Sequence, residues 1–262
     1  MLAYLEYLPS LVIGMARIYP CAILVPAFCF QHIRGMLRHV IVMVMALIPT
    51  PAIHAALQGQ EHSALLIAGL VLKEVALGIL LGVLLSMPFW LFESVGALLD
   101  NQRGALTGGQ INPSLGPDAT PIGHMFKQLA ILLLLVTLGL GVLTQVIWDS
   151  YLIWPATAWL PLPAVGGFSV FLGLMGDTFT HMMLYAAPFI AVLLLLEFGV
   201  ALLSLYSPQL QVSSLAMPVK CLAGLAFLLL YLPLLQDLIV NRMSLLGDLK
   251  HGLGVMFGGA GP

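Results

Sequence analysis

The sequence from Ala64 to Leu99 reads ALLIAGLVLKEVALGILLGVLLSMPFWLFESVGALL and decides the fold class. Its 36 residues include only three charged side chains, Lys73, Glu74 and Glu93. As one straight α-helix it would be about 54 Å long, whereas about 20 residues suffice to cross the hydrocarbon of a bilayer. The length therefore predicts a membrane-type helix that tilts, projects from the bilayer or bends, and Pro88 is the expected bend.

The whole chain has the composition of a membrane protein. Of its 262 residues, 61% are hydrophobic and 8% are charged, whereas soluble domains carry about 25% charged residues. This composition excludes a soluble enzyme, a disordered chain and a coiled coil. The formal net charge of −2 provides no basic surface, so nucleic acid is not an expected partner. We predict an all-α, polytopic membrane-type protein of six to seven hydrophobic, partly broken helical segments, forming one domain over residues 1–262.

The other apolar stretches contain proline or glycine residues, which can interrupt a helix. They are Leu8–Phe30, Val40–Leu57, Leu129–Trp148, Val165–Tyr206 and Leu215–Val240. The stretch from Val165 to Tyr206 is long enough for two helices, with interruptions expected at Gly176-Asp177 and Pro188. Helix breaks are predicted at Pro20, Pro88, Pro188 and Pro208. The glycine-rich residues 247–262 predict a flexible tail.

A polar segment from Asp100 to Gly123 separates two of the apolar stretches. It contains five glycines, three prolines and two asparagines and has no sustained apolar period. Structureless loops longer than about 15 residues are uncommon and are often functional. A second segment, 149–167, carries aromatic side chains beside prolines, which is typical either of an aromatic belt at a membrane interface or of a protein contact.

Six charged residues lie within apolar segments, at Arg17, Lys73, Glu74, Glu93, Glu197 and Lys220. A charge at the bilayer centre costs from about 2.5 to more than 10 kcal/mol, so each requires an explanation. Lys73 and Glu74 are adjacent and point about 100° apart on a helix, so we expect them to pair with other residues and not with each other. Two interpretations stay open: an ion or proton relay, and ion pairing between helices or between subunits.

No catalytic motif is present. The sequence lacks HExxH, GxSxG, SxxK and a P-loop lysine, so hydrolase and ATPase chemistry has neither a nucleophile nor a phosphate site. The three cysteines and the scattered histidines form no metal-ligand spacing. We predict no enzymatic activity, no cofactor and no metal.

Two ordered groups of residues resemble a known family. The first is Ser86-Met-Pro-Phe-Trp90 followed by 100–105; the second is 194–204, then Ser207-Pro-Gln209 and Lys220. Together they are similar to the T component of type III secretion export apparatuses, the SpaR/YscT family, which is related to the flagellar export protein FliR. Leu205 and Gln211 depart from that pattern, because the family commonly has arginine and asparagine at these places.

The resemblance implies a subunit of an inner-membrane export gate. Such a subunit would assemble with the R, S and U components, contact inner rod or needle proteins and membrane lipid, and form part of the channel for unfolded secreted substrates. It would be a multi-pass protein of the bacterial inner membrane, with segments raised into the periplasm, and its inner charges would pair across subunits. The resemblance also implies that the polar segment plugs the pore, through Asn101, Gln102, Arg103, Gly104, Gly108, Gly109, Asn112 and Pro113.

An alternative is an ion or small-molecule transporter that uses the inner charges as a relay. Transporters often consist of repeated halves with broken helices, and no internal duplication is visible in this sequence. A third alternative is a membrane-embedded enzyme or an assembly scaffold. The enzyme would need a catalytic pair that the sequence does not offer.

Overall fold

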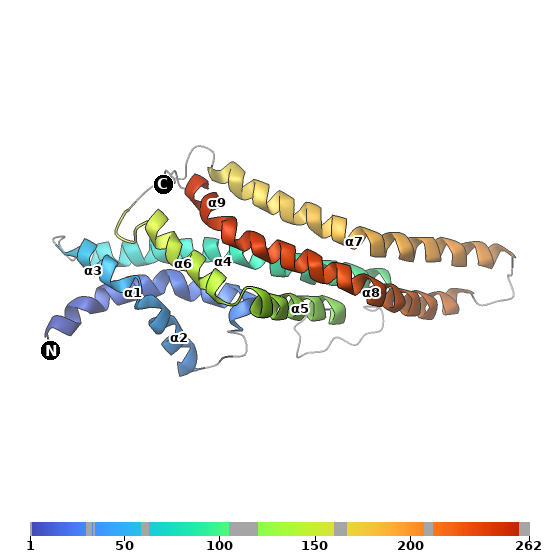
Figure 1. Ribbon diagram of the computed structural model, residues 1–262, viewed down its shortest axis with the longest axis horizontal. Helices are drawn as coiled ribbons and strands as arrows, with labels where there is room; N and C mark the ends of the chain where they lie inside the picture. Colours follow the sequence, from blue (N-terminus) through green and yellow to red (C-terminus); the bar gives the residue numbers. More distant parts are fainter. Residues whose placement is uncertain are drawn as a thin grey trace. The chain divides into compact units, whose positions relative to one another are not determined.

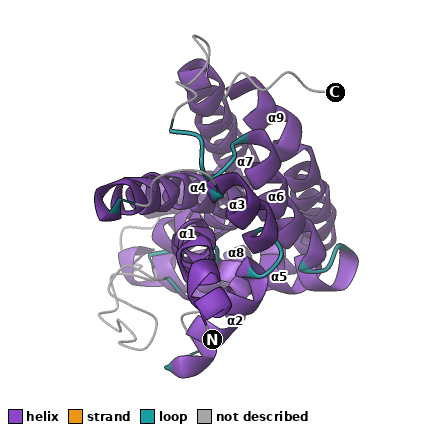
Figure 2. Cartoon of the chain, turned by 90° about the vertical axis from the view of Figure 1, so that its left-hand side faces the viewer, coloured by secondary structure: helices purple, strands orange, loops and turns teal. Residues whose placement is uncertain are grey.

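A computed structural model of the protein describes residues 2–29, 33, 35–58, 63–104, 120–159, 167–206 and 212–256. Over these ranges the regular structure is helical and contains no β-strand (Figure 2). The prediction of an all-α fold is therefore confirmed.

The helices differ greatly in length, and α4 and α7 are the longest (Figure 1). In chain order they are α1 (Leu2–Leu24), the 3-10 helix η1 (Pro26–Phe28), α2 (Met36–Ala46), α3 (Thr50–Leu57), α4 (Ala64–Gln102), α5 (Pro121–Thr137), α6 (Gly141–Ile153), α7 (Gly167–Tyr206), α8 (Val212–Ser244), the 3-10 helix η3 (Leu245–Asp248) and α9 (Leu249–Met256).

Four helical segments are long and apolar enough to cross a membrane: Tyr7–Leu24, Ala64–Gln102, Gly167–Tyr206 and Ala216–Gly247. The number rises to six if the bent pairs α2–α3 and α5–α6 each count as one span. The polytopic membrane-type prediction is confirmed, with four to six such segments in the described part of the chain where the sequence predicts six to seven.

The prolines do not end the long helices. Pro20, Pro88 and Pro188 lie inside α1, α4 and α7, so the helices continue through these positions and the division of Val165–Tyr206 into two helices is wrong. The bend expected at Pro88 stays a prediction. A proline removes one backbone hydrogen bond, which can bend a helix without ending it. The other backbone groups of an apolar helix still need internal partners, which favours continuation. Pro208 lies outside the described residues.

The chain forms two compact units. Unit 1 comprises Met1–Met87, Leu138–Leu174 and Met243–Pro262, and unit 2 comprises Pro88–Thr137 and Met175–Arg242. The helix α4 passes from one to the other between Met87 and Pro88. That residues 1–262 act as a single domain stays a prediction.

Within unit 1, α1 lies directly against the first half of α4 and also contacts α2 and α3. A Cβ atom on Gly78 would lie 2.2 Å from the carbonyl oxygen of Arg17, so the two backbones touch at this glycine. Small residues permit such close helix contacts in membrane-type proteins. The approach brings the charged side chains of α1 and α4 within reach of each other.

The C-terminal end of the described chain is helical where the sequence predicts a flexible tail from Gly247. Helix α9 contacts α6 in unit 1 and buries Leu253 and Met256. These apolar side chains recur near helical spacing, so they can pack on one face. Residues 257–262 lie outside the described ranges.

Unit 2 contains a close contact between α4 and α5 and an antiparallel pairing of α7 with α8. A Cβ atom on Gly96 would lie 2.6 Å from the Cα atom of Gly123. On α7, Phe189 is buried and its ring lies 4.7 Å from the ring of Tyr231 on α8, in an edge-to-face arrangement. Aromatic pairs with this geometry stabilise the contact beyond their buried area.

Candidate functional site

The described part of unit 1 encloses an ion pair between α1 and α4. The side chains of Arg17 and Glu74 are 1% and 0% exposed. Nε of Arg17 donates to Oε2 of Glu74 over 2.7 Å, and Nη2 donates to Oε1 over 2.9 Å. This two-pronged arrangement is the strongest that an arginine and a carboxylate can adopt.

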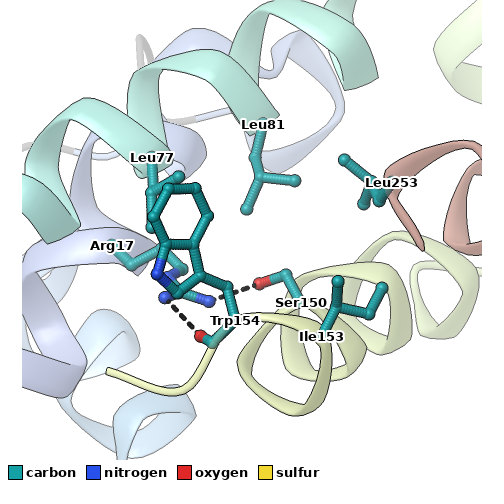
Figure 3. A pocket seen from close by; sticks show the side chains of 7 residues that line it. All are labelled: Arg17, Leu77, Leu81, Ser150, Ile153, Trp154 and Leu253. Carbon is teal, nitrogen blue, oxygen red and sulfur yellow. Dashed lines mark hydrogen bonds between the residues drawn. The ribbon is translucent and has the colours of Figure 1, made fainter. Parts of the chain in front are cut away.

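The remaining donors of Arg17 are directed at the end of α6. Nη1 donates to Oγ of Ser150 over 3.0 Å, and Nη2 donates to the carbonyl oxygen of Trp154 over 2.9 Å (Figure 3). The guanidinium carbon lies 4.1 Å from the ring centre of Tyr151, which adds a cation–π contact. All three guanidinium nitrogens thus have partners, as a buried cation requires.

Lys73 completes what we call the Arg17 cluster, which consists of Arg17, Lys73, Glu74, Ser150, Tyr151 and Trp154. Nζ of Lys73 lies 2.9 Å from Oε1 of Glu74, so the expectation that Lys73 and Glu74 do not pair is wrong. The long, flexible lysine side chain can curl around the helix toward its neighbour. It is held there because Nζ also donates to the carbonyl oxygens of Ala156 and Ala158, over 2.7 and 2.9 Å.

The Arg17 cluster joins α1, α4 and the C-terminal end of α6 by contacts within one chain. A small cavity beside the cluster is lined by Arg17, Ser150 and Trp154 and by the apolar side chains of Leu77, Leu81, Ile153 and Leu253 (Figure 3). Within the described ranges, no three His, Cys, Asp or Glu side chains lie together as a metal site would require; the absence of metals and cofactors stays a prediction.

The other charges predicted from the sequence also pair within the chain, in unit 2. Oε1 of Glu93 on α4 lies 2.6 Å from Nζ of Lys127 on α5. Oε2 of Glu197 on α7 lies 3.0 Å from Nζ of Lys220 on α8. These contacts correspond to the interpretation of pairing between helices. Lys127 was missed because it precedes the apolar stretch that begins at Leu129, and charges at the ends of such stretches are ordinary.

A second buried carboxylate, Asp100, joins the end of α4 to the start of α5 in unit 2. Its side chain is fully buried, and Oδ1 accepts hydrogen bonds from Nε of Arg103, over 2.8 Å, and from Nη2. Oδ2 accepts the backbone N–H of Ile122 over 2.7 Å. We call this arrangement the Asp100 clasp. Sequence reasoning missed the role of Asp100, although a carboxylate three residues before an arginine at the end of an apolar helix was a usable signal.

The clasp lies at the two ends of the predicted plug segment. Asn101 and Gln102 form the end of α4, and Gly104 follows with a φ of 75°, a conformation that glycine adopts at little cost. Gly108, Gly109, Asn112 and Pro113 lie outside the described residues. The plug function of this segment therefore stays a prediction.

Comparison with known proteins identifies the family. The profile of "Bacterial export proteins, family 1" matches residues 8–246. The chain is 32% identical over 218 residues to the Yop proteins translocation protein T of Yersinia pestis, covering 83% of each chain. It is 32% identical over 231 residues to the surface presentation of antigens protein SpaR of Salmonella typhimurium, covering 87% of this chain and 85% of the relative. The flagellar biosynthetic protein FliR of Pectobacterium carotovorum is 26% identical over 187 residues, 69% of this chain and 68% of the relative.

Because the profile and the relatives cover most of the chain, the resemblance seen in the sequence is confirmed: the chain belongs to family 1 of the bacterial export proteins, as the T component of a type III export apparatus related to FliR.

Proposed function

We propose that the chain is a non-catalytic subunit of the inner-membrane export gate of a type III secretion system. In this role it forms part of the channel for unfolded secreted proteins and assembles with the R, S and U components and with inner rod or needle proteins. The observation that carries the proposal is the family match over residues 8–246, a range that includes every residue of the Arg17 cluster and of the Asp100 clasp.

The geometry of the inner charges supports a structural role over a relay. A relay needs groups that exchange partners along a path, whereas the guanidinium of Arg17 is bound on every nitrogen and Glu74 is fully buried between two cations. Moving either ion away from the cluster would leave the other buried charge without its partner, which costs several kcal/mol. We therefore assign the cluster to holding unit 1 together.

The Asp100 clasp supports a plug or constriction role for the segment between α4 and α5. The glycines and prolines of this segment predict irregular backbone, which within a membrane is tolerated only where protein or a watery cavity surrounds it. The clasp fixes both ends of the segment to one carboxylate. In this proposal the segment between them obstructs the resting channel and moves during export.

The lengths of α4 and α7 support a location in which part of the chain is raised above the bilayer. Their 39 and 40 residues correspond to about 60 Å of helix, twice the thickness of the hydrocarbon. We propose that the chain is a multi-pass inner-membrane protein with segments extending on the periplasmic side.

Purification of tagged protein from its native host in mild detergent, with mass spectrometry of what accompanies it, tests the proposal. Recovery of unlike R-type and S-type membrane proteins would support the export gate. A protein that purifies alone or as a homo-oligomer and transports ions in vesicles would refute it in favour of the transporter.

The plug role has a separate test in the assembled complex. Deletion of residues 108–116 should raise the ion conductance of the complex in planar bilayers, because the obstruction is removed. A glycine–serine segment of the same length serves as the control for chain connectivity. Unchanged conductance in the deletion would refute the plug role and leave the export role intact.

A further inference from the structure

The last helix of the described chain, α9, covers one side of the cavity beside the Arg17 cluster. Leu253 of α9 is 2% exposed and lines this cavity together with Arg17. The other lining side chains belong to α1, α4 and the end of α6 (Figure 3). A helix at the far end of the sequence thus completes the surroundings of an ion pair formed by α1 and α4.

The cavity leaves little room for water. Its volume is about 10 Å³, whereas one water molecule needs about 10–15 Å³ and several polar partners. Opposite charges attract each other more strongly where water is kept away, because water raises the effective dielectric constant. The side chain of Leu253 therefore occupies space that water would otherwise fill beside the guanidinium of Arg17.

A small contact area holds α9 in this place. Among its described side chains, those of Leu253 and Met256 are buried. It packs against α6 and η3, and its end touches the start of α7, where a Cβ atom on Gly167 would lie 2.3 Å from the carbonyl oxygen of Met256. A helix of eight residues is too short to be stable in isolation, so α9 depends on these contacts.

The chain before α9 allows this helix to detach without disturbing η3. Leu246 of η3 is 2% exposed, and η3 contacts α6 independently of α9. Gly247 follows, and a Cβ atom added there would have nothing within 4 Å. Segments with few buried apolar contacts open more readily than the core around them. The structure therefore contains an anchored turn, a glycine and then a lightly held helix.

We propose that α9 is a lid on unit 1. When docked, it keeps water away from the ion pair of Arg17 and Glu74; when detached, it admits water and weakens the joint between α1, α4 and α6. The profile match ends at residue 246, so the lid lies outside the part of the chain that the family profile matches. The inference concerns unit 1 alone and goes beyond the export role.

Cysteine labelling inside the cavity tests the lid. The reporter is Leu81→Cys, because Leu81 lines the cavity and is 3% exposed. The control reporter is Leu85→Cys, one helical turn further along α4, where the leucine is 0% exposed and does not line the cavity. Both are made in a chain whose native cysteines are replaced by alanine. The full chain, purified in mild detergent with the subunits that accompany it, reacts with N-ethylmaleimide, and mass spectrometry follows the labelled fraction over time.

Two substitutions should open the lid from different sides. Leu253→Ala removes an apolar side chain that docks α9, and Gly167→Ala pushes against the backbone of Met256 at a place outside the cavity. Each should raise the labelling rate of Leu81→Cys by about tenfold or more, because truncating or overpacking a buried contact favours the detached state. Val255→Ala, on the same helix and 49% exposed, should change that rate by less than about twofold.

The control reporter separates opening of the lid from loosening of unit 1. Leu85→Cys should react slowly and at the same rate in every variant. An unchanged rate at Leu81→Cys with either opening substitution, an equal rise at both reporters, or an equal effect of Val255→Ala would overturn the lid. These rates do not bear on the proposed function, which fails only if the unlike subunits do not accompany the chain.

Discussion

Removing the negative charge from the Arg17 cluster is the most direct test of how unit 1 is held together. The variant Glu74→Gln keeps the shape of the side chain and leaves the cations of Arg17 and Lys73 without their shared anion. Arg17 cannot lose its proton and is 1% exposed, so its charge stays buried with only neutral partners.

The magnitude follows from the geometry. Two opposite charges about 4 Å apart interact by about 4 kcal/mol at the effective dielectric constant of about 20 that reproduces protein data. Removing one partner of a buried ion pair typically lowers the free energy of unfolding by about 3–5 kcal/mol. We expect Glu74→Gln to lower the free energy of unfolding by that amount. The matched control is Glu197→Gln, whose carboxylate is 57% exposed and whose loss should cost less than about 1 kcal/mol.

The assay is unfolding of the purified full chain in mixed micelles by increasing dodecyl sulfate, followed by circular dichroism. The double variant Arg17→Met with Glu74→Leu removes both fully buried ions and should be far more stable than the sum of the single variants predicts, because no buried guanidinium is left without its anion. Lys73 loses its carboxylate partner in this variant, but its ammonium keeps the carbonyl oxygens of Ala156 and Ala158. A loss below about 1 kcal/mol for Glu74→Gln would refute the reasoning, since exposed pairs are worth no more. So would additive losses in the double variant.

Three further substitutions use the same unfolding measurement. Gly78→Ala should lower the free energy of unfolding by about 1–3 kcal/mol, because its Cβ would overlap backbone atoms of α1. The control Gly173→Ala has open space around its Cβ and should leave stability unchanged or raise it slightly. Equal effects of the two substitutions would contradict the close contact at Gly78. Asp100→Ala should cost about 1–3 kcal/mol because it leaves a backbone N–H at the start of α5 without its acceptor, and no change would argue against the clasp. Tyr151→Phe removes the 2.6 Å hydrogen bond to the carbonyl oxygen of Gly14 and should cost about 1 kcal/mol; a stabilised variant would show that this bond is not formed.

Composition and length predicted the fold class, because an apolar chain with few charges has few alternatives to packed helices in a membrane. The continuity of α7 could not be read from the sequence. Pro188 and Gly176-Asp177 are local signals for a break, but the energetic need to satisfy backbone groups in apolar surroundings outweighs the single hydrogen bond that proline removes.

The charges were predicted as a set but not as pairs. Intramembrane position identified Arg17 and Glu74 as residues that need partners, yet nothing local indicates which helices meet. The pairing depends on the close approach at Gly78, a contact between residues 61 positions apart in the sequence. Lys73 was assigned wrongly because helical geometry fixes Cβ directions, while a four-carbon side chain can reach well away from that direction.

The location of these pairs bears on how the subunit would recognise its partners. The sequence left open that the inner charges are completed by neighbouring subunits, which would make assembly depend on them. In the structure Arg17 and Glu74 bind each other within unit 1 and are 1% and 0% exposed, so charged groups of a neighbouring subunit cannot reach them without opening unit 1. Contacts with unlike subunits should then rest on apolar surface and on the segment held by the Asp100 clasp. It follows that Arg17→Met with Glu74→Leu should still accompany the other export components on purification, provided that the double variant folds; loss of those components from a folded double variant would return the charges to the interface.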